Sequence, residues 1–303
     1  MKHTAHYLIY GLLLVFLLTG CEKEEEHYKQ IVLGGFSPDG NKLALSYCTT
    51  RSICKTGLFD INQKKFDEIT PQNPDRFYIP GGFSPDGSLL ALTVRRNSDQ
   101  GKTTQVAVFE LATKKLTEIT HSEGRRASPS FSHDGKKILH TQSNRERTSG
   151  QTRFADWDVY ETQWRDSKER RLTAFKFFMI LSSSYLPGDE KFIFSGDSPH
   201  AYVSPTGKKG YKAYRDKFHE NEIFILTSAG PQHLEPIFIR EDFSSSPVIS
   251  QDGSQLVYVA MSQHLDNVKT RFTYDLFLFD GQQHQRLTKL NSWISDVSMS
   301  FNG

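Results

Sequence analysis

The residues of this chain that are best suited to binding chemistry lie in one segment, Ser204–Glu220, which reads SPTGKKGYKAYRDKFHE. It mixes cations with aromatic side chains, and tyrosine and arginine are common anchors of protein interfaces. Such a segment suits an acidic protein surface or an anionic polymer, with attraction that weakens as salt rises. A merely solvated loop is the alternative. The candidate binding residues are Lys208, Lys209, Tyr211, Lys212, Tyr214, Arg215 and Lys217.

Further cations gather in two earlier segments that separate strand-like stretches. Cations outnumber acids there, so both segments extend the candidate binding surface. The whole chain is nevertheless close to neutral, with a formal net charge of +2 over 303 residues, which argues against a nucleic-acid partner. The additional candidates are Arg95 and Arg96 in the first segment and Arg145, Arg147 and Arg153 in the second.

A search for catalytic motifs finds none. The chain has no Gly-x-Ser-x-Gly elbow, no His-Glu-x-x-His pair and no Cys-x-x-Cys motif. We therefore expect no catalytic residue, no metal and no cofactor, and we interpret His140 as a histidine of the core or of a strand edge. A histidine-bound metal stays open as an alternative, because four histidines lie in or beside the segments that hold the cations. They are His121, His200, His219 and His264.

The first twenty residues predict export. A charged start is followed by an apolar run from Tyr7 to Leu18, which is short for a membrane-spanning helix and suits a signal peptide. The run ends in Leu-Thr-Gly-Cys, which resembles a bacterial lipobox, so we expect residues 1–20 to be removed and Cys21 to be acylated. An ordinary signal peptide or an uncleaved anchor is the alternative. Residues 21–27 then form an acidic tether, although their acidic run also resembles a surface-export signal.

Two cysteines remain in the predicted mature chain, Cys48 and Cys54. An exported protein meets an oxidising compartment, so a disulfide between them is plausible. It would close a short hairpin loop and contribute roughly 2 kcal/mol in the chain-entropy model. Two free thiols are the alternative.

These segments must be positioned by a repeated frame. The turn FSPDG ends at Gly40 and again at Gly87, FSHDG ends at Gly135, and ISQDG ends at Gly253. Aspartate binds the local backbone and glycine accepts a positive φ in each copy, and in the first two copies Pro38 and Pro85 also preset the turn, so each copy joins two antiparallel strands. A period of roughly 40–50 residues is typical of propellers and solenoids. The longer interval before Gly253 contains a degenerate copy, YLPGD, at residues 185–189.

Each repeat continues in the same way. Apolar residues alternate after the turn, as in a strand with one buried face. A third strand ends in an acidic residue, and a fourth closes with an aliphatic residue and threonine. Four antiparallel strands in each unit predict an all-β fold, a β-propeller of four-stranded blades. The closing pairs are Ile69-Thr70, Ile119-Thr120, Leu172-Thr173 and Leu287-Thr288.

This pattern resembles the WD40-like repeat of TolB-type β-propellers, and it covers residues 28–303. TolB carries an α/β domain before its propeller, whereas here we expect the first blade to begin within about ten residues of Cys21. The resemblance implies six blades, whereas the sequence supplies five complete units and the first strand of a sixth. A truncated six-bladed propeller is therefore favoured over a tight or open ring of five, because an unclosed ring exposes strand edges.

The resemblance is specific for fold and weak for function, since propellers host many activities. The leading hypothesis is a non-enzymatic scaffold, anchored by lipid in a bacterial outer membrane, facing the periplasm and presenting its basic loops to an envelope protein. Exposure at the cell surface is the alternative location. The alternative function is a polysaccharide-active enzyme that resembles oligogalacturonide lyases and holds a metal with histidines. The oligomeric state is left open.

Overall fold

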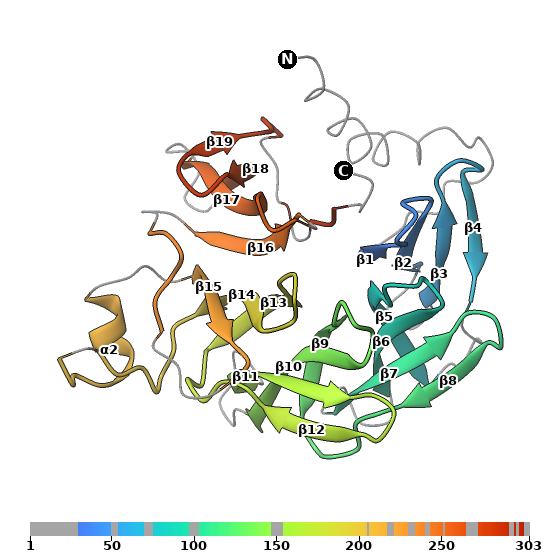
Figure 1. The fold of residues 1–303 in the computed structure, drawn as a ribbon, viewed down its shortest axis with the longest axis horizontal. Coiled ribbons are helices and arrows are strands. Elements are labelled where there is room, and N and C mark those ends of the chain that lie inside the picture. The colour runs from blue at the N-terminus through green and yellow to red at the C-terminus, as the bar shows by residue number, and fades with distance from the viewer. Residues whose placement is uncertain are drawn as a thin grey trace.

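The computed structural model describes residues 30–49, 54–69, 75–96, 103–146, 154–204, 206–216, 221–229, 234–239, 243–250, 252–264 and 272–290, with residue 294 and residues 297–299. Within these residues the chain forms five antiparallel sheets arranged as blades around a common centre (Figure 1). The predicted propeller of five blades is confirmed. The described residues contain no helix with the length and apolar character needed to cross a membrane.

Four of the blades have four strands in simple sequential order, innermost strand first. Blade 1 consists of β1 (Gln30–Phe36), β2 (Lys42–Cys48), β3 (Cys54–Asp60) and β4 (Lys65–Glu68). Blade 2 consists of β5 (Arg76–Phe83), β6 (Leu89–Arg96), β7 (Thr104–Glu110) and β8 (Lys115–Glu118). Blade 3 consists of β9 (Arg125–Phe131), β10 (Lys137–Glu146), β11 (Phe154–Gln163) and β12 (Lys168–Arg171). Blade 5 consists of β16 (Ser244–Ile249), β17 (Leu256–His264), β18 (Phe272–Phe279) and β19 (His284–Arg286).

Blade 4 is the irregular one. It pairs β13 (Met179–Tyr185), β14 (Lys191–Asp197) and β15 (Asn221–Thr227), and it carries a short helix, α2 (Gly210–Arg215), between β14 and β15. Its outer position is taken by a segment that forms a single bridge, Phe224 to Pro236, and in which the Ile237 amide donates to the Ile223 carbonyl at 3.0 Å. The fourth strand expected here is thus reduced to a bridge.

The repeated turn forms for the reasons that its sequence suggests. The Ser37 hydroxyl donates to the Asp39 carboxylate at 2.5 Å, and the Lys42 amide donates to Ser37 Oγ at 2.9 Å. Gly40 has a φ of 71°, in the left-handed region that favours glycine. The serine–aspartate bond recurs in three further copies, at Ser84–Asp86, Ser132–Asp134 and Ser250–Asp252.

The innermost strands pack closely against one another, in the order β1, β5, β9, β13 and β16. Each innermost strand pairs with the second strand of its own blade, and the register of each pair is shifted at one point. Such a bulge bends the innermost strand as it passes the centre. The approach is tightest between blades 2 and 3, where a Cβ added to Gly81 would lie 2.1 Å from the Pro129 carbonyl oxygen. The innermost strands therefore form a tightly packed centre, and the segments that differ between blades lie at the rim.

The expected first strand of a sixth unit falls on residues after β19. Beyond Leu290 the structure describes residue 294 and residues 297–299, which are half-buried.

Candidate binding face

Two faces of the propeller differ in what they carry. The turn face holds the repeated turns that join the first two strands of each blade. The loop face, on the other side, holds the connections between second and third strands and the connections between blades. The predicted binding segments belong to the loop face, and much of them lies outside the described residues, namely residues 97–102, 147–153, 217–220 and 265–271.

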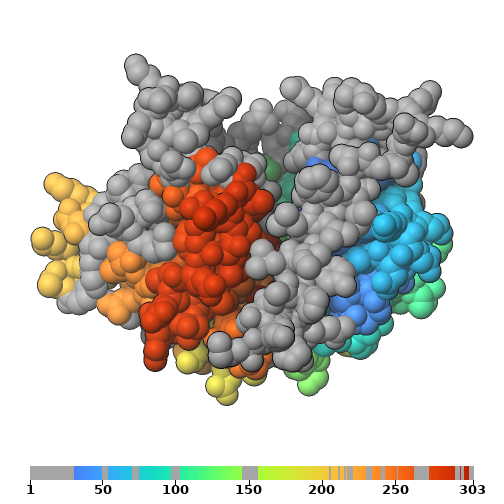
Figure 2. Space-filling model, turned by 90° about the horizontal axis from the view of Figure 1, so that it is seen from above, coloured from blue at the N-terminus to red at the C-terminus, as the bar shows by residue number. Residues whose placement is uncertain are grey.

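The insertion in blade 4 presents its lysines outward. Lys208, Lys209 and Lys212 are all exposed. Figure 1 places α2 outside the ring beyond β15, and Figure 2 shows the same part of the chain, in yellow, projecting from the side of the molecule. The three cations are therefore available to a partner that approaches the rim of blade 4.

The insertion is held in place by its aromatic residues. Tyr214 is 0% exposed and packs edge-on against Tyr202, with ring centroids 5.4 Å apart. Ala213 is also buried in the same core cluster. The prediction that Tyr214 is a binding residue is wrong, because one side of α2 must bury its apolar side chains on blade 4. Tyr214 anchors the insertion instead.

A tight turn fixes the lysines relative to blade 4. The Ser204 amide donates to the Lys208 carbonyl at 2.8 Å, and the Gly210 amide donates to the Tyr202 carbonyl at 2.8 Å. The Lys208 amide also donates to Ser204 Oγ at 3.1 Å. The side chains of Tyr211 and Arg215, and all of Lys217, lie outside the described residues, so their predicted roles stay predictions.

Blade 2 brings two of the predicted arginines to the loop face. Arg95 and Arg96 end β6 and are half-buried. The Arg96 guanidinium Nη2 lies 2.6 Å from Glu118 Oε2, and Arg76 Nη1 lies 3.1 Å from Glu118 Oε1. The sequence analysis missed Arg76 and Glu118, because they are distant from Arg96 along the chain and come close to it only in the folded sheet. In blade 3 the Arg145 side chain and all of Arg147 and Arg153 lie outside the described residues.

The interior of blade 3 holds a polar cluster. His140 is 0% exposed, its Nε2 lies 3.0 Å from Thr162 Oγ1, and its ring stacks on Tyr160. Burial, and then the charge of Arg126, lower the pKa of His140 to about 3, so it is neutral. Its Nδ1 has no hydrogen-bond partner among the described residues. His140 is thus a core histidine as predicted, with one nitrogen satisfied.

Arg126 joins blades 2 and 3 beside this histidine. It is 1% exposed, and its Nη1 donates to the Ser122 carbonyl at 2.9 Å and to Gln105 Oε1 at 3.2 Å. Its Nη2 lies 3.4 Å from Glu169 Oε2. Such a buried, well-partnered guanidinium is a structural element rather than a site open to ligands.

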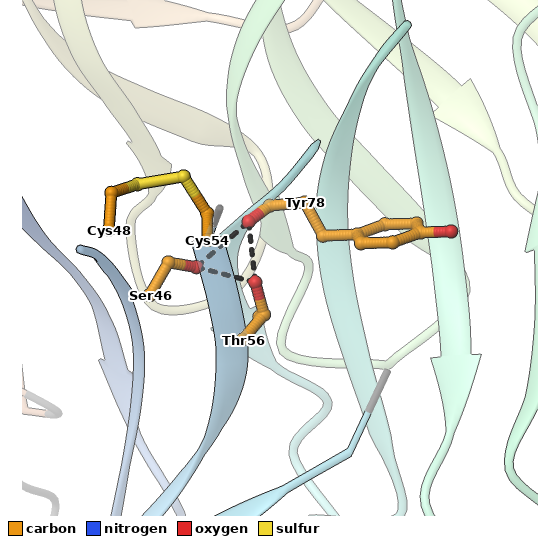
Figure 3. The surroundings of a disulfide bond; sticks show 5 residues. All are labelled: Ser46, Cys48, Cys54, Thr56 and Tyr78. Atoms are coloured by element: carbon orange, nitrogen blue, oxygen red, sulfur yellow. Dashed lines mark hydrogen bonds between the residues drawn. A yellow bond between two sulfur atoms is a disulfide. The ribbon is translucent and has the colours of Figure 1, made fainter. Parts of the chain in front are cut away.

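A disulfide joins Cys48 and Cys54, which face each other at the ends of β2 and β3 (Figure 3). Next to it, the Ser46 and Thr56 hydroxyls both donate to the Tyr78 carbonyl of blade 2, at 2.8 Å and 2.7 Å. The disulfide therefore closes the loop-face end of a hairpin that is hydrogen-bonded to the next blade.

The histidines of the metal alternative are only partly described. His121 is exposed in the connection between β8 and β9, and His200 Nδ1 lies 3.8 Å from an Asp156 carboxylate oxygen in the next blade. His219 and the side chain of His264 lie outside the described residues. Among the residues that are described, no group of three or more histidine, cysteine or acidic side chains is placed to hold a metal ion. Cys21 also lies outside them.

Comparisons with known proteins identify the fold. No protein-family model matches the chain, and no curated protein matches it either. Among solved structures it is similar to a putative TolB from Agrobacterium tumefaciens, with a TM-score of 0.56 and 16% identity over 85% of this chain and 80% of that one. For TolB from Acinetobacter baumannii the TM-score is 0.55 and the identity 17%, over 85% of this chain and 52% of that one.

An enzyme shares this architecture. An oligogalacturonate lyase in complex with manganese gives a TM-score of 0.54 at 15% identity, over 85% of this chain and 66% of that chain. The chain thus spans about half of one TolB and about two thirds of the lyase. At such identities the likenesses speak for architecture alone, and what they establish is that this chain has a TolB-like β-propeller fold.

Proposed function

We propose that this protein is a non-enzymatic scaffold that presents the basic residues of its loop face to an acidic envelope protein. The observation that carries the proposal is the blade 4 insertion, in which Lys208, Lys209 and Lys212 are exposed while Tyr214 is fully buried. A loop that is anchored in the core and keeps its cations in solvent loses little conformational freedom on binding. Its charge attracts an acidic partner over a distance that salt shortens.

The proposal includes a lipid anchor. Acylation of Cys21 after removal of residues 1–20 would tether the propeller to a membrane through residues 21–27, with the periplasmic side of the outer membrane as the proposed site. Metabolic labelling with a radioactive fatty acid tests this. Label should enter the wild-type chain and be absent from a Cys21→Ala variant, and equal labelling of both would exclude Cys21 as the acceptor.

The binding proposal is tested by purification of partners from detergent-solubilised envelopes, with the full chain as bait. A variant with Lys208, Lys209 and Lys212 changed to glutamate should lose a partner that the wild type retains. The matched control changes three exposed lysines on the turn face, Lys64, Lys114 and Lys115, to glutamate and should keep the partner. Raising the salt concentration should weaken retention by the wild type and the control alike.

Two outcomes would overturn the proposal. Loss of the partner in both variants would show that overall charge, and not the insertion, controls retention. Absence of any stoichiometric partner, together with cleavage of oligogalacturonides by the purified chain, would favour the enzyme alternative. Apart from fold, no observation on the described residues favours that alternative.

A further inference from the structure

At the loop-face end of blade 2, two arginines share one glutamate. Arg76 and Arg96 are direct cross-strand partners at the beginning of β5 and the end of β6. Like charges directly opposite each other in a sheet are destabilising. A single carboxylate, Glu118, lies between them, with one oxygen hydrogen-bonded to each guanidinium at 3.1 Å and 2.6 Å. We call these three residues the blade 2 fork.

The fork keeps a net charge of +1 after this internal pairing. Its arginines are part-exposed, at 34% and 39% of their side-chain surface, whereas Glu118 is 16% exposed. Each guanidinium has five donor groups, and each gives one hydrogen bond to Glu118. Donors and solvent access therefore remain on the outer side of both arginines. Arg95 precedes Arg96 on β6 and, because side chains alternate along a strand, belongs to the other face of the sheet.

The equivalent positions in blades 3 and 5 are balanced. The positions are matched by a backbone hydrogen bond that recurs in the three blades, in which the amide of Ile119, Leu172 or Leu287 donates to a carbonyl of the third strand. The residues just before these three are Glu118, Arg171 and Arg286, so these occupy equivalent positions. Arg171 pairs with one buried aspartate, Asp158, and Arg286 pairs with one buried aspartate, Asp275. Each of those positions therefore has one cation for one anion. At the corresponding position of blade 2, Glu118 instead pairs with two arginines.

The neighbouring edge of blade 1 supports the fork. Both β2 and β3 contact β5, and the Tyr78 carbonyl accepts the Ser46 and Thr56 hydroxyls there. Cys48 and Cys54 lie two residues beyond Ser46 and Thr56 toward the loop face, and Arg76 lies two residues beyond Tyr78 in the same direction. The disulfide-bonded ends of β2 and β3 are therefore expected at the same level as Arg76. The fork is thus flanked by a hairpin whose end is covalently closed, which limits reorganisation when a ligand binds.

We propose that the blade 2 fork is a carboxylate-binding site that takes an acidic side chain of the partner. One added carboxylate would neutralise the remaining +1 charge of the fork. Planar guanidinium groups match the two oxygens of a carboxylate and bind it through charge-assisted hydrogen bonds. The inference rests on the proposed function, since it assumes that the partner is an acidic protein, and it adds a second contact point to the blade 4 insertion.

The test uses the full chain in detergent and a fluorescent hexaglutamate peptide, with binding followed by anisotropy. Arg76→Gln and Arg96→Gln should each weaken binding about tenfold, as expected for loss of one charge-assisted hydrogen bond. The matched control is Arg165→Gln, which removes the same charge from an exposed turn between β11 and β12, where Arg165 stacks on Trp164. It should bind like the wild type. A hexaglutamine peptide should not bind.

Equal weakening by Arg96→Gln and Arg165→Gln would overturn the inference, because the effect would then be one of net charge. So would undetectable binding of hexaglutamate to a wild type that is folded by circular dichroism. Tighter binding of trigalacturonate than of hexaglutamate at the same arginines would reassign the site to uronate recognition. An envelope partner that is lost in the blade 4 lysine variant and retained in Arg76→Gln and Arg96→Gln would refute the fork while leaving the proposed function standing.

Discussion

Blade 3 and blade 2 use charge at the same outer position in opposite ways. In blade 3, Arg171 on the outer strand pairs with Asp158, which is 0% exposed and also accepts the Thr173 hydroxyl at 2.7 Å. In blade 2, Glu118 on the outer strand holds Arg76 and Arg96, and both guanidiniums reach solvent. The first arrangement joins β11 to β12 and to the connection that follows through a buried carboxylate, whereas in the second two arginines share one part-exposed carboxylate. The same fold position thus serves stability in one blade and, by our proposal, recognition in another.

The largest effect should come from breaking the blade 3 arrangement. Asp158 also accepts the Phe175 amide at 2.9 Å, so Asp158→Ala leaves buried donors and a charged arginine without their acceptor. We expect it to lower the free energy of unfolding by about 3 kcal/mol, measured by urea denaturation. Glu118→Ala is the matched change in blade 2 and should cost about 1 kcal/mol or less, because Glu118 is 16% exposed, whereas Asp158 is fully buried, so water can replace the lost carboxylate. Equal losses would contradict the contrast between the blades.

The disulfide of blade 1 should give the next largest effect. A Cys48→Ser, Cys54→Ser variant should lose about 2 kcal/mol of unfolding free energy, because the loop it frees is short. Wild-type protein treated with dithiothreitol should lose the same amount, and the variant should not respond to the reductant. A response of the variant to dithiothreitol would mean that the reductant acts elsewhere.

The decrease in the free energy of unfolding at acid pH should depend on His140 in the interior of blade 3. Burial lowers the folded-state pKa of His140 to about 3, below its ordinary value of 6.5, so unfolding takes up a proton between these values. The contribution of His140 is fully present above pH 6.5 and falls with a limiting slope of about 1.4 kcal/mol for each pH unit below it. The groups that face it are Arg126, Tyr160, Thr162 and Glu169.

Urea denaturation between pH 4 and pH 7 measures this slope. His140→Gln should flatten the dependence, and the exposed His121→Gln, as a matched control, should leave it unchanged. An unchanged slope in His140→Gln would mean that other groups carry the acid sensitivity.

The propeller blades could be predicted from the sequence because each is specified by residues that are close together along the chain. Each repeated turn is specified by residues within five positions of one another, and each closing threonine follows an aliphatic residue directly. The hydrogen-bond partner of the closing threonine could not be predicted. In blade 3, for example, Thr173 donates to Asp158, which is 15 residues earlier in the chain and is brought close only when the strands pair. Arg76 and Glu118 were missed for the same reason.

The candidate site was predicted less well than the frame. Composition identified the cations of the blade 4 insertion, and Lys208, Lys209 and Lys212 are exposed as a binding role requires. Composition alone does not say which side of a short helix faces the core, so Tyr214 was misassigned. Arg96 was expected in a free loop, but it ends a strand and already holds a carboxylate.

The most direct test of this account is the affinity of Glu118→Gln for hexaglutamate at a fixed, low ionic strength. If the fork binds carboxylates, removal of its internal carboxylate frees both arginines, and the variant should bind the peptide more tightly than the wild type while Glu110→Gln, on the turn face, does not. If Glu118 only holds the strands together, Glu118→Gln will bind the peptide no better than the wild type, and the recognition role of blade 2 will be contradicted.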